Sequence, residues 1–546
     1  MKRPWVFFCS YARYSPEVRR RPLTLEQILF DADRTTRYLT RATAKHLVEK
    51  MTGCFEPQSV VCLHMFNDIL YIPLFLAILA SRATWTGTNP AYTAHELADH
   101  LNRTKARYVV VEQGLVETAL EATSKCSTCL SVIIFEDLLS ESLPDVPSVP
   151  KGAHADVVSL SGWITRARPA HRENQSIKTM PDDTVAALMS TSGTTGLPKL
   201  ACRSQHALKM ESGAMGDELN DKPYPIRRLF CTPIFHAFSL VIMAVNALRY
   251  GHQTYVMRRF DSTFSEKVFQ LQITETAATP VMLHRLAVTS KVQRSELASL
   301  RLMWCGGVTL TCDVRLKTLA LLRKEARIVQ VWGMTEGGWF TTFHHPEDNN
   351  DGSVGRPLHG WEIKVSPGPN EHNQSDFLKG EIYIRGPQLM TEYYNDPEAT
   401  RAAFECGWFK TGDIGYIQQG KVYLIDRVKN MIKVNGFQVA PAELENVIGG
   451  HPNVTDCAVI RSGSGISEHP LVFLVSTTQR LSETDVKQHM LRFLARYKVS
   501  HCRVRFTDQI PRGGTGKVLT HRLREDCGFQ VPRFESSGQA PQEDAR

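Results

Sequence analysis

The chain has 546 residues, a net charge of +8, and a composition that is 42% hydrophobic and 22% charged. This composition excludes a collagen-like or disordered chain, and the length indicates two or more domains. The positive charge is modest and dispersed, and we interpret its tight cluster at residues 19–21 as a solvated loop, so we expect no nucleic-acid partner.

The first part of the chain alternates short apolar runs with longer segments of helical pattern. We expect strands at residues 60–64, 108–112 and 131–135, and helices at residues 25–50, 71–80 and 94–103. Such alternation is typical of α/β layers built on parallel sheets. Residues 136–179 are polar and contain prolines, which indicates a long surface connection.

A loop rich in hydroxyl groups and glycines follows a strand predicted at residues 185–189. Residues 190–199 read Ser-Thr-Ser-Gly-Thr-Thr-Gly-Leu-Pro-Lys. Glycines let backbone N–H groups converge on one point, and Lys199 adds a positive charge, so the loop suits a nucleotide triphosphate. The alternative is an ordinary Ser/Thr/Gly surface turn. We expect a strand at residues 199–203 and a helix from Gln205 to follow.

Two other nucleotide-binding motifs are disfavoured by their context. A Walker loop places its lysine beside Ser or Thr at a helix start, whereas Lys199 follows a proline and begins a strand. The second candidate, residues 513–517, has Pro511 and Val518 at the defining positions. Glu468 stands where a Rossmann fingerprint needs its third glycine, so a P-loop ATPase and a dinucleotide-binding protein are both disfavoured.

The later part of the chain changes character near residue 380. Before this point we expect strands at residues 227–232, 254–257, 301–305 and 327–331. Short alternating strands at residues 381–385, 415–418 and 422–425 then indicate a small antiparallel or barrel-like piece.

These patterns predict an α/β protein with two domains. The expected parts are a large N-terminal domain of layered α/β sheets at residues 1–425, a small α+β C-terminal domain at residues 426–535, and a disordered tail at residues 536–546. The thirteen cysteines form no disulfide framework, and we recognise neither a secretory leader nor a C-terminal peroxisomal tripeptide. The most apolar run, residues 69–80, is too short to span a bilayer. We therefore expect a cytoplasmic location and no membrane span.

Six motifs occur along the chain in a fixed order. They are the loop at residues 190–199, Trp-Gly-Met-Thr-Glu at 332–336, Gly-Glu-Ile-Tyr-Ile-Arg-Gly-Pro at 380–387, Thr-Gly-Asp at 411–413, Lys-Val-Asn-Gly-Phe-Gln-Val-Ala-Pro-Ala-Glu-Leu-Glu at 433–445, and Pro-Arg-Gly-Gly-Thr-Gly-Lys at 511–517. Together they resemble the acyl-adenylate-forming enzymes of the AMP-binding superfamily, and most of all the 4-coumarate:CoA ligases and related acyl-CoA synthetases. The resemblance covers nearly the whole chain and implies a small C-terminal domain that turns between two half-reactions.

The resemblance implies ligation of a carboxylic acid to coenzyme A with ATP and Mg²⁺. The acid would attack the α-phosphorus of ATP and expel pyrophosphate, and the thiol of coenzyme A would then attack the acyl adenylate. Two alternatives stay open. The acyl group could pass to another acceptor, such as a separate carrier protein or oxygen, or the chain could be a non-catalytic relative that binds nucleotides or acyl groups.

The resemblance also assigns residues to the nucleotide. The ATP and AMP site would comprise Thr191, Ser192, Gly193, Thr194, Thr195, Gly196, Lys199, Gln330, Trp332, Gly333, Thr335, Asp413, Arg427 and Lys517. Asp413 would accept both ribose hydroxyls with support from Arg427. Gln330, Trp332 and Gly333 would line the adenine slot. Lys199 would bind the leaving pyrophosphate.

The catalytic assignments follow from the same motifs. Glu336 would hold Mg²⁺, and Thr335 would lie near the α-phosphate. Lys517 would contact the carboxylate and the α-phosphate during adenylation, Lys433 and Gln438 would assist catalysis, and Lys429 would be the hinge. The simpler interpretations are a solvated carboxylate for Glu336, a core residue for Trp332 and a solvated basic face for the lysines.

The remaining assignments concern the acid and coenzyme A. The acyl pocket would be lined by His236, Phe238, Cys305, Gly306, Gly307, Val308, Gly333, Met334 and Gly338, and coenzyme A would contact Arg259 or its neighbour Arg258, together with Asn435 and Gly436. The pocket residues are mostly apolar or small, as a hydrophobic acid requires. His236 would gate the pocket, and the alternative is a structural histidine. The chain departs from the family pattern at Cys305, Thr309 and Asn435, and Trp339 is large for its place.

Overall fold

The computed structural model describes residues 27–33, 37–139, 155–167, 181–191, 199–215, 222–288, 292–307, 310, 312–349, 351–367, 378–427, 430–434, 437–463, 468–478, 481–494, 496–512 and 518–525. The chain divides into two units, Met1–Lys429 and Asn430–Arg546. The boundary predicted from the sequence lies at residue 425. The tail expected at residues 536–546 lies outside the described residues.

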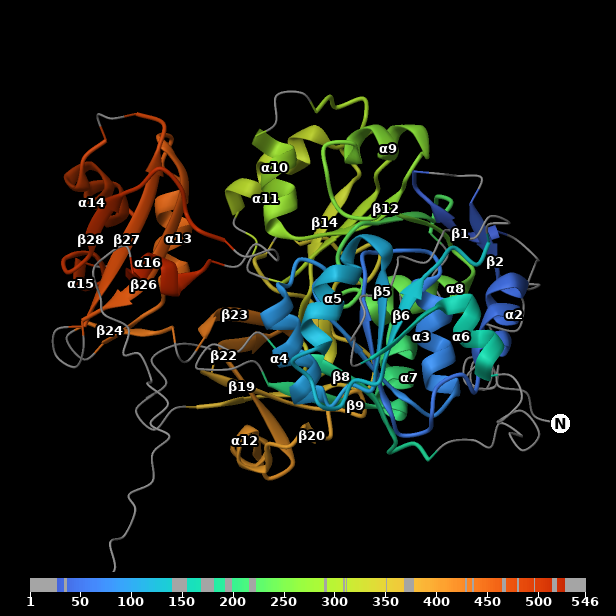
Figure 1. Ribbon diagram of the computed structural model, residues 1–546. Helices are drawn as coiled ribbons and strands as arrows, with labels where there is room; N and C mark the ends of the chain where they lie inside the picture. Colours follow the sequence, from blue (N-terminus) through green and yellow to red (C-terminus); the bar gives the residue numbers. More distant parts are fainter. Residues whose placement is uncertain are drawn as a thin grey trace, which may run out of the picture. The chain divides into compact units, whose positions relative to one another are not determined.

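Within the described part of the first unit, eight strands form a sheet in the order β20-β9-β8-β4-β3-β5-β6-β7 (Figure 1). The parallel strands are β3 (Val60–His64), β4 (Thr84–Gly87), β5 (Tyr108–Glu112), β6 (Ser131–Phe135), β7 (Asp156–Ser159) and β8 (Val185–Ser190). The strand β9 (Leu200–Ser204) pairs antiparallel with β8, and β20 (Glu392–Tyr393) pairs antiparallel with β9. The central strands are continuous apolar runs because helices cover both faces of the sheet.

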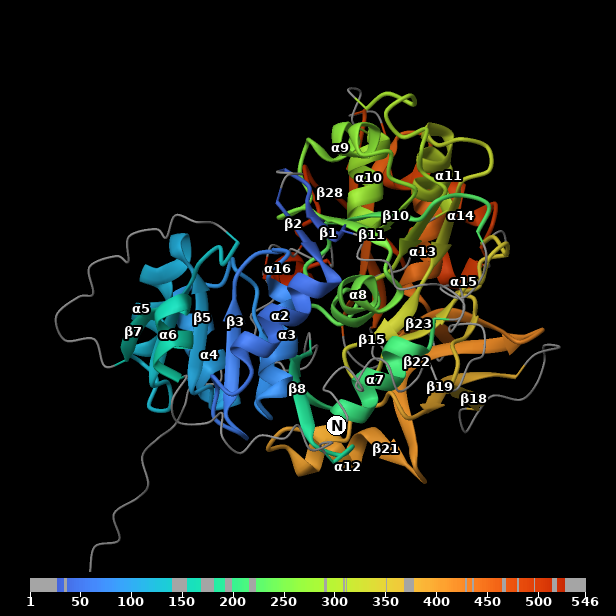
Figure 2. The ribbon, with the colours of Figure 1, turned by 90° about the vertical axis from the view of Figure 1, so that its right-hand side faces the viewer.

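Helices pack on both faces of this sheet (Figure 2). One face carries α4 (Ala94–Thr104) and α5 (Val116–Thr123), and the other carries α2 (Arg41–Met51), α3 (Tyr71–Ala80) and α6 (Leu160–Ala167). A capping box begins α4, because the Thr93 hydroxyl accepts from the Glu96 N–H and the Glu96 carboxylate accepts from the Thr93 N–H. Of the helices in the described residues, none is long and apolar enough to cross a bilayer.

A second sheet has seven strands among the described residues, in the order β14-β13-β12-β10-β11-β1-β2. They are β14 (Arg327–Gln330), β13 (Leu302–Cys305), β12 (Glu275–Ala278), β10 (Arg227–Phe230), β11 (Gln253–Val256), β1 (Gln27–Asp31) and β2 (Tyr38–Thr40). One face packs on α9 (Phe264–Gln270), α10 (Pro280–Val288) and α11 (Cys312–Leu321). The other face shares one apolar core with the first sheet, through α2, α3, α7 (Gln205–Gly213), a π-helix at Leu240–Val245 and α8 (Asn246–Tyr250).

Two antiparallel sheets complete the described part of the first unit. The smaller contains β15 (Trp332–Met334), β16 (Gly338–Thr342) and β17 (Arg356–Pro357). The larger contains β18 (Glu362–Ser366), β19 (Lys379–Arg385), β21 (Phe404–Glu405), β22 (Trp408–Gln418) and β23 (Lys421–Arg427). The helix α12 (Pro397–Ala403) directly precedes β21 in the chain. The larger sheet corresponds to the antiparallel or barrel-like piece predicted from the sequence.

The second unit has its own apolar core, which includes Leu444, Val472 and Met490. Its described strands are β24 (Ile432–Val434), β25 (Phe437–Val439), β26 (Val454–Ser462), β27 (His469–Ser476) and β28 (Arg503–Phe506). Its described helices are α13 (Pro441–Gly449), α14 (Glu483–Leu491), α15 (Arg496–Val499) and α16 (Thr520–Glu525). The strands β26 and β27 are antiparallel, whereas β27 and β28 are parallel.

The predicted α/β fold class is confirmed, with two local errors. The expected helix at residues 25–50 is wrong in its first half, where the chain forms β1 and β2 before α2 begins at Arg41. The run Ile28, Leu29 and Phe30 is buried because β1 pairs with the distant strand β11, and this tertiary pairing overrides local helix propensity. The connection expected at residues 136–179 contains β7 and α6.

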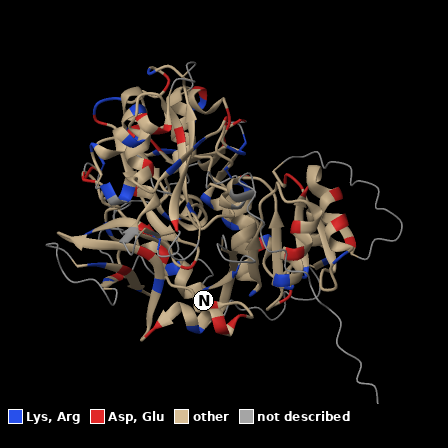
Figure 3. Cartoon of the chain, turned by 90° about the vertical axis from the view of Figure 1, so that its left-hand side faces the viewer, with Lys and Arg blue, Asp and Glu red and all other residues tan. Residues whose placement is uncertain are grey.

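Basic and acidic residues are interspersed over the described elements (Figure 3). Several opposite charges lie one helical turn apart, including Lys45 with Glu49 and Lys125 with Glu121. Such exposed pairs contribute only about 0.3–0.5 kcal/mol each to stability. The more consequential charge pairs of this protein are therefore the buried ones.

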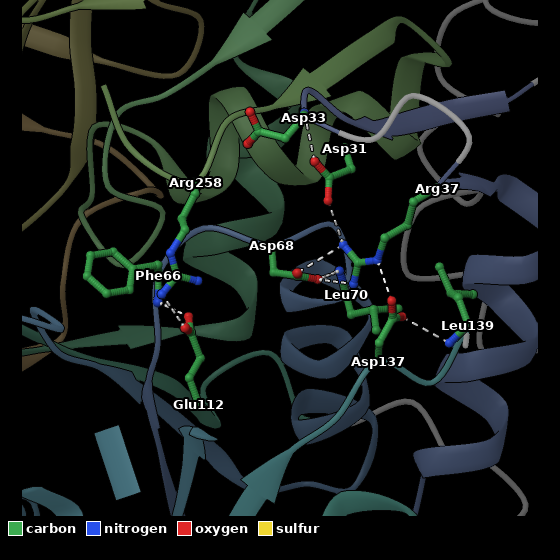
Figure 4. A network of polar contacts seen from close by, with 10 residues as sticks. All are labelled: Asp31, Asp33, Arg37, Phe66, Asp68, Leu70, Glu112, Asp137, Leu139 and Arg258. Atoms are coloured by element: carbon green, nitrogen blue, oxygen red, sulfur yellow. Dashed lines mark hydrogen bonds and ion pairs between the residues drawn. The ribbon is translucent and has the colours of Figure 1, made fainter. Parts of the chain in front are cut away.

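A polar network around Arg37 joins the carboxyl ends of the two large sheets (Figure 4). The Arg37 guanidinium donates to Asp31 at 3.2 Å, to both oxygens of Asp68 at 3.0 and 3.1 Å, and to Asp137 at 2.7 Å. Asp31 ends β1 of the seven-stranded sheet, whereas Asp68 and Asp137 follow β3 and β6 of the eight-stranded sheet. Asn67 bridges the same boundary by donating to the carbonyl oxygens of Thr232 and Met257.

We expect Arg37→Met to lower the free energy of unfolding of the first unit by about 3 kcal/mol, because it leaves three carboxylates facing one another without their shared cation. Arg166→Met is the matched control, since Arg166 pairs with Asp156 at the exposed surface and should cost less than about 1 kcal/mol. Urea unfolding followed by tryptophan fluorescence measures both changes. Equal losses in the two variants would show that the network does not hold the sheets together.

Candidate active site

The hairpin formed by β15 and β16 has almost no space between its strands. A Cβ atom on Gly333 would lie 2.2 Å from the carbonyl oxygen of Gly338. Gly338 has a φ of +76°, and a Cβ there would lie 2.2 Å from an oxygen of Glu211. Glycine is therefore required at both positions. The turn between the strands contains Thr335 and Glu336, two of the predicted site residues.

A buried ion pair supports this turn. Arg203 on β9 and Glu211 on α7 are 2.8 Å apart, with side chains that are 0% and 2% exposed. Arg203 also donates to the carbonyl oxygen of Thr335 at 3.4 Å. Burial raises the pKa of Glu211 to about 7, and the guanidinium of Arg203 limits this increase. The pair therefore contacts the hairpin at two places, Thr335 and Gly338.

Asp413 is held by a donor on each of its two oxygens. The indole N–H of Trp332 donates to Oδ2 at 2.9 Å, and Nε of Arg427 lies 2.9 Å from Oδ1. Asp413 and Arg427 are opposite each other in the β22–β23 ladder, and Asp413 is only 5% exposed. Because each carboxylate oxygen has two acceptor sites, both oxygens keep one for a further donor. This is the capacity that the predicted contact with two ribose hydroxyls needs.

Trp332 is both a core residue and a neighbour of the site. Its ring is buried and packs edge-to-face on Phe340, with 5.0 Å between centroids, while its N–H reaches Asp413. The side chain of Gln330 has another partner, because its oxygen accepts from the N–H of Leu310 at 3.2 Å. The adenine-slot role of both residues remains a prediction.

A second cluster lies on the turn of the hairpin and contains Glu336, Tyr393 and Lys199. The Tyr393 hydroxyl donates to Oε1 of Glu336 at 2.8 Å, and Glu336 is 6% exposed. The ammonium of Lys199 lies 4.9 Å from the centroid of the Tyr393 ring. The structure thus brings the predicted magnesium ligand and the predicted pyrophosphate ligand to one tyrosine.

The ends of the Ser/Thr/Gly loop meet beside this cluster. The N–H of Thr191 donates to the carbonyl oxygen of Lys199 at 2.8 Å, and the N–H of Lys199 donates to the Thr191 hydroxyl at 3.2 Å. These bonds extend the antiparallel pairing of β8 and β9 by one step. The loop residues between them, from Ser192 to Gly196, lie outside the described residues.

Aromatic side chains form one wall of the predicted acyl pocket. Phe238 stacks on Trp339 with 5.2 Å between centroids, and Trp304 meets Trp339 edge-on at 6.2 Å. Gly306 lies directly under this wall, because a Cβ there would be 2.6 Å from the Phe238 ring. On β16, Trp339 belongs to this wall, whereas the next residue, Phe340, packs against Trp332.

The polar members of the predicted pocket are uncharged. Nδ1 of His236 accepts from the N–H of Phe238 at 3.2 Å, and burial lowers the pKa of His236, so its imidazole is neutral near pH 7. Cys305 is buried, and burial raises the pKa of its thiol. Met334 packs against the main core. These residues offer an apolar surface.

Of the two arginines considered for coenzyme A, Arg258 already has partners. Its guanidinium lies 2.6 Å from Glu112 and 4.2 Å from the Phe66 ring centroid, as Figure 4 shows. Arg259 is exposed. Arg258 is also exposed, so the expected contact of Arg259 or Arg258 with coenzyme A stays a prediction.

The predicted site residues in the described part of the first unit form two groups by their expected role, and contacts join Thr191 with Lys199, Trp332 and Arg427 with Asp413, and Phe238 with His236 and Gly306. The two groups are the nucleotide group, with Thr191, Lys199, Gln330, Trp332, Gly333, Thr335, Glu336, Asp413 and Arg427, and the acyl group, with His236, Phe238, Cys305, Gly306, Gly307, Met334 and Gly338. In the second unit, Lys433 and Gln438 are opposite each other in the β24–β25 pair. Val308, Lys429, Asn435, Gly436 and Lys517 lie outside the described residues.

Sequence reasoning missed three residues of this region: Arg203, Glu211 and Tyr393. An arginine inside the apolar run of β9 was a signal for a buried ion pair, since charged residues are rarely buried without a partner. The identity of that partner, and the role of Tyr393, depend on contacts between elements that are distant in the chain.

We expect Arg203→Ala to lower the free energy of unfolding by about 3–5 kcal/mol, because it leaves Glu211 buried without its counter-charge. The double variant Arg203→Met/Glu211→Leu should recover most of this loss, since it removes both charges and keeps much of their volume. Urea unfolding of the single and double variants provides the comparison. A double variant that is as unstable as Arg203→Ala would contradict this assignment.

Comparisons with known proteins agree with this geometry. The AMP-binding enzyme family model matches residues 36–394, and the AMP-binding enzyme C-terminal domain model matches residues 443–517. Acyl-CoA ligase M9 from Phoma sp. is 42% identical over 501 residues, which cover 91% of this chain and 92% of that protein. Phenylacetyl-CoA ligase epaB from Aspergillus niger is 34% identical over 539 residues, with 96% of both chains covered.

Solved structures share the fold. ATP-bound MatB from Rhodopseudomonas palustris has a TM-score of 0.77 at 22% identity and covers 96% of this chain and 99% of its own. The anthranilate CoA ligase AuaEII in complex with anthranoyl-AMP has a TM-score of 0.79 at 20% identity, with 94% and 96% covered. The family models and the relatives that cover nearly the whole chain lead to one conclusion: this chain belongs to the AMP-binding enzyme family.

Proposed function

We propose that this protein is an AMP-forming acyl-CoA ligase that activates an apolar carboxylic acid. The observation that carries the proposal is the presence of two oriented carboxylates at the β15–β16 hairpin, Glu336 in its turn and Asp413 bonded to its residue Trp332. Asp413 is fixed by Trp332 and Arg427, and Glu336 is fixed by Tyr393. Relatives that cover nearly the whole chain are acyl-CoA ligases, which supports the same activity.

The first half-reaction joins two anions and therefore needs oriented donors and cations. A carboxylate oxygen of the acid attacks the α-phosphorus of ATP, the bond to the bridging oxygen breaks, and pyrophosphate leaves. Asp413 would hold the ribose, so that the α-phosphorus has a fixed position relative to the acid pocket. Lys199 would bind the phosphates that leave, and Lys517 would balance the charge at the α-phosphate.

Glu336 fits a magnesium ligand. It is buried, one of its oxygens carries the Tyr393 hydrogen bond, and a carboxylate has further acceptor sites for a cation. Among the described residues no group of three His, Cys, Asp or Glu side chains is arranged to hold a metal ion, so Glu336 would hold Mg²⁺ as a single protein carboxylate. When bound, Mg²⁺ would neutralise the charge that develops on the leaving pyrophosphate.

In the second half-reaction the sulfur of coenzyme A attacks the carbonyl carbon of the acyl adenylate, and AMP leaves with the bonding electrons. Lys433 and Gln438 are proposed to assist here. Their positions opposite each other in a short hairpin are consistent with joint action. The hinge role of Lys429 and the coenzyme A contacts of Arg259, Asn435 and Gly436 are part of the same proposal.

The pocket wall indicates the substrate class. Phe238 presents a partly exposed aromatic ring that is backed by the buried Trp339 and Trp304, and His236 is neutral, so a second carboxylate would find no cation among these residues. An apolar acid, aryl or aliphatic, gains free energy by covering this surface. The described pocket residues therefore favour apolar monocarboxylic acids over dicarboxylic acids.

We expect pyrophosphate release to depend on an added apolar monocarboxylic acid, and an acyl thioester to form when coenzyme A is present. A panel of aryl, medium-chain and long-chain acids, with succinate as the charged control, tests this in a coupled pyrophosphate assay with mass spectrometry of the products. Pyrophosphate release with succinate but with none of the apolar acids would contradict the proposed preference for apolar monocarboxylic acids. Absence of acid-dependent pyrophosphate across the panel would reject the ligase function, and thioester on a carrier protein but not on coenzyme A would favour the other acceptor.

We expect Lys517→Ala to reduce acid-dependent pyrophosphate release by about two orders of magnitude or more, because the charge at the α-phosphate is lost. The same variant should form thioester from supplied acyl-AMP and coenzyme A at close to the normal rate. Lys487→Ala is the control, since Lys487 forms an ion pair with Glu483 on α14. Equal loss of both half-reactions in Lys517→Ala would overturn the role assigned to Lys517.

A further inference from the structure

The segment from Met390 to Tyr394 connects two parts of the nucleotide group. Its strand β20 pairs with β9, and the N–H groups of Thr391 and Tyr394 donate to the carbonyl oxygens of Cys202 and Leu200 at 3.0 and 2.8 Å. The strand β9 begins directly after Lys199. The segment is therefore fixed to the end of the Ser/Thr/Gly loop by backbone bonds that do not depend on its side chains.

The same segment holds Glu336 at two points. The N–H of Met390 donates to the backbone carbonyl oxygen of Glu336 at 2.7 Å, and the hydroxyl of Tyr393 donates to its carboxylate at 2.8 Å. Tyr393 is buried, with 7% of its surface exposed. A hydrogen bond from a neutral donor to a buried carboxylate is stronger than one between neutral groups. The carboxylate is thereby restricted to one orientation.

The ring of Tyr393 makes a second contact, with Lys199. The ammonium of Lys199 lies 4.9 Å from the Tyr393 ring centroid, within the range of a cation–π interaction. The hydroxyl of a tyrosine is a hydrogen-bond donor at neutral pH, so both contacts can be made at the same time.

We propose that Tyr393 is a positioning residue of the ATP site, which orients Glu336 through its hydroxyl and Lys199 through its ring. One side chain would then set the relative placement of the magnesium-side carboxylate and the pyrophosphate-side ammonium. This inference rests on the proposed function, because it gives Glu336 and Lys199 the roles proposed above. Tyr393 contacts neither the nucleotide nor the acid in this scheme.

The two contacts can be separated by substitution. Tyr393→Phe keeps the ring near Lys199 and removes the hydroxyl from Glu336. Tyr393→Leu removes both contacts. Tyr394→Phe is the matched control, because Tyr394 is adjacent in the chain, loses the same hydroxyl, and packs against a different apolar cluster that includes Cys202 and Leu188.

The test is the affinity of the full chain for ATP with Mg²⁺, for ATP with chelator, and for AMP, measured by titration calorimetry. We expect Tyr393→Phe to weaken binding of MgATP by about tenfold and to change binding of AMP by less than twofold, because AMP lacks the phosphates that Mg²⁺ and Lys199 contact. Tyr393→Leu should weaken MgATP binding by a further two- to fivefold. The Mg²⁺ concentration needed for half-maximal ATP binding should rise in both variants and stay constant in Tyr394→Phe.

Each result bears on a different statement. Unchanged MgATP affinity in Tyr393→Phe would overturn the inference while leaving the proposed function intact. Parallel losses for MgATP and AMP would show that Tyr393 only stabilises the fold, which also overturns it, and thermal unfolding of the variants would confirm that explanation. If the unmodified chain binds AMP but gains nothing from Mg²⁺ and the additional phosphates, the roles of Glu336 and Lys199 fail, and the positioning role is rejected with them.

Discussion

The close approach of Gly333 and Gly338 is the constraint on which the rest of the site depends. A side chain on Gly333 would meet the backbone of β16, and a side chain on Gly338 would meet Glu211 on α7, so the hairpin packs closely within itself and against the helix. In that arrangement the N–H of Trp332 reaches Asp413 on the neighbouring antiparallel sheet, and the carboxylate of Glu336 reaches the hydroxyl of Tyr393. The site is therefore positioned by backbone packing before any of its side chains form a hydrogen bond.

Buried charges surround this hairpin, and their arrangement suggests specificity rather than stability. Arg203 and Glu211 are almost fully buried, as are Arg228, Lys222 and Glu275 farther along the second sheet. The desolvation cost of such groups largely offsets their attraction, so they contribute little net stability compared with apolar residues of the same size. They do, however, penalise any packing that separates the partners, which makes one arrangement of the hairpin and its supporting strands strongly preferred.

Much of the fold could be predicted from the sequence where local pattern and final burial agree. The runs at residues 60–64, 108–112 and 131–135 are strands with the expected bounds because helices bury both of their faces. Residues 27–31 were wrongly predicted as helix because their apolar run is buried by pairing with β2 and with β11, and β11 lies more than two hundred residues later in the chain. For the site, motif residues such as Asp413 and Glu336 could be named in advance. Arg203, Glu211 and Tyr393 could not, since their function arises from partners that the fold alone brings together.

The alternation of side chains along β16 has a consequence for how such enzymes diversify. Trp339 faces the aromatic wall with Phe238, and Phe340, one residue later, faces Trp332. Successive residues of a strand point to opposite faces, so the surface proposed to select the acid and the surface proposed to support the nucleotide are separated by a single peptide unit. Under these proposed roles, a substitution on one face of β16 would change the choice of acid and leave the residues around Trp332 in place.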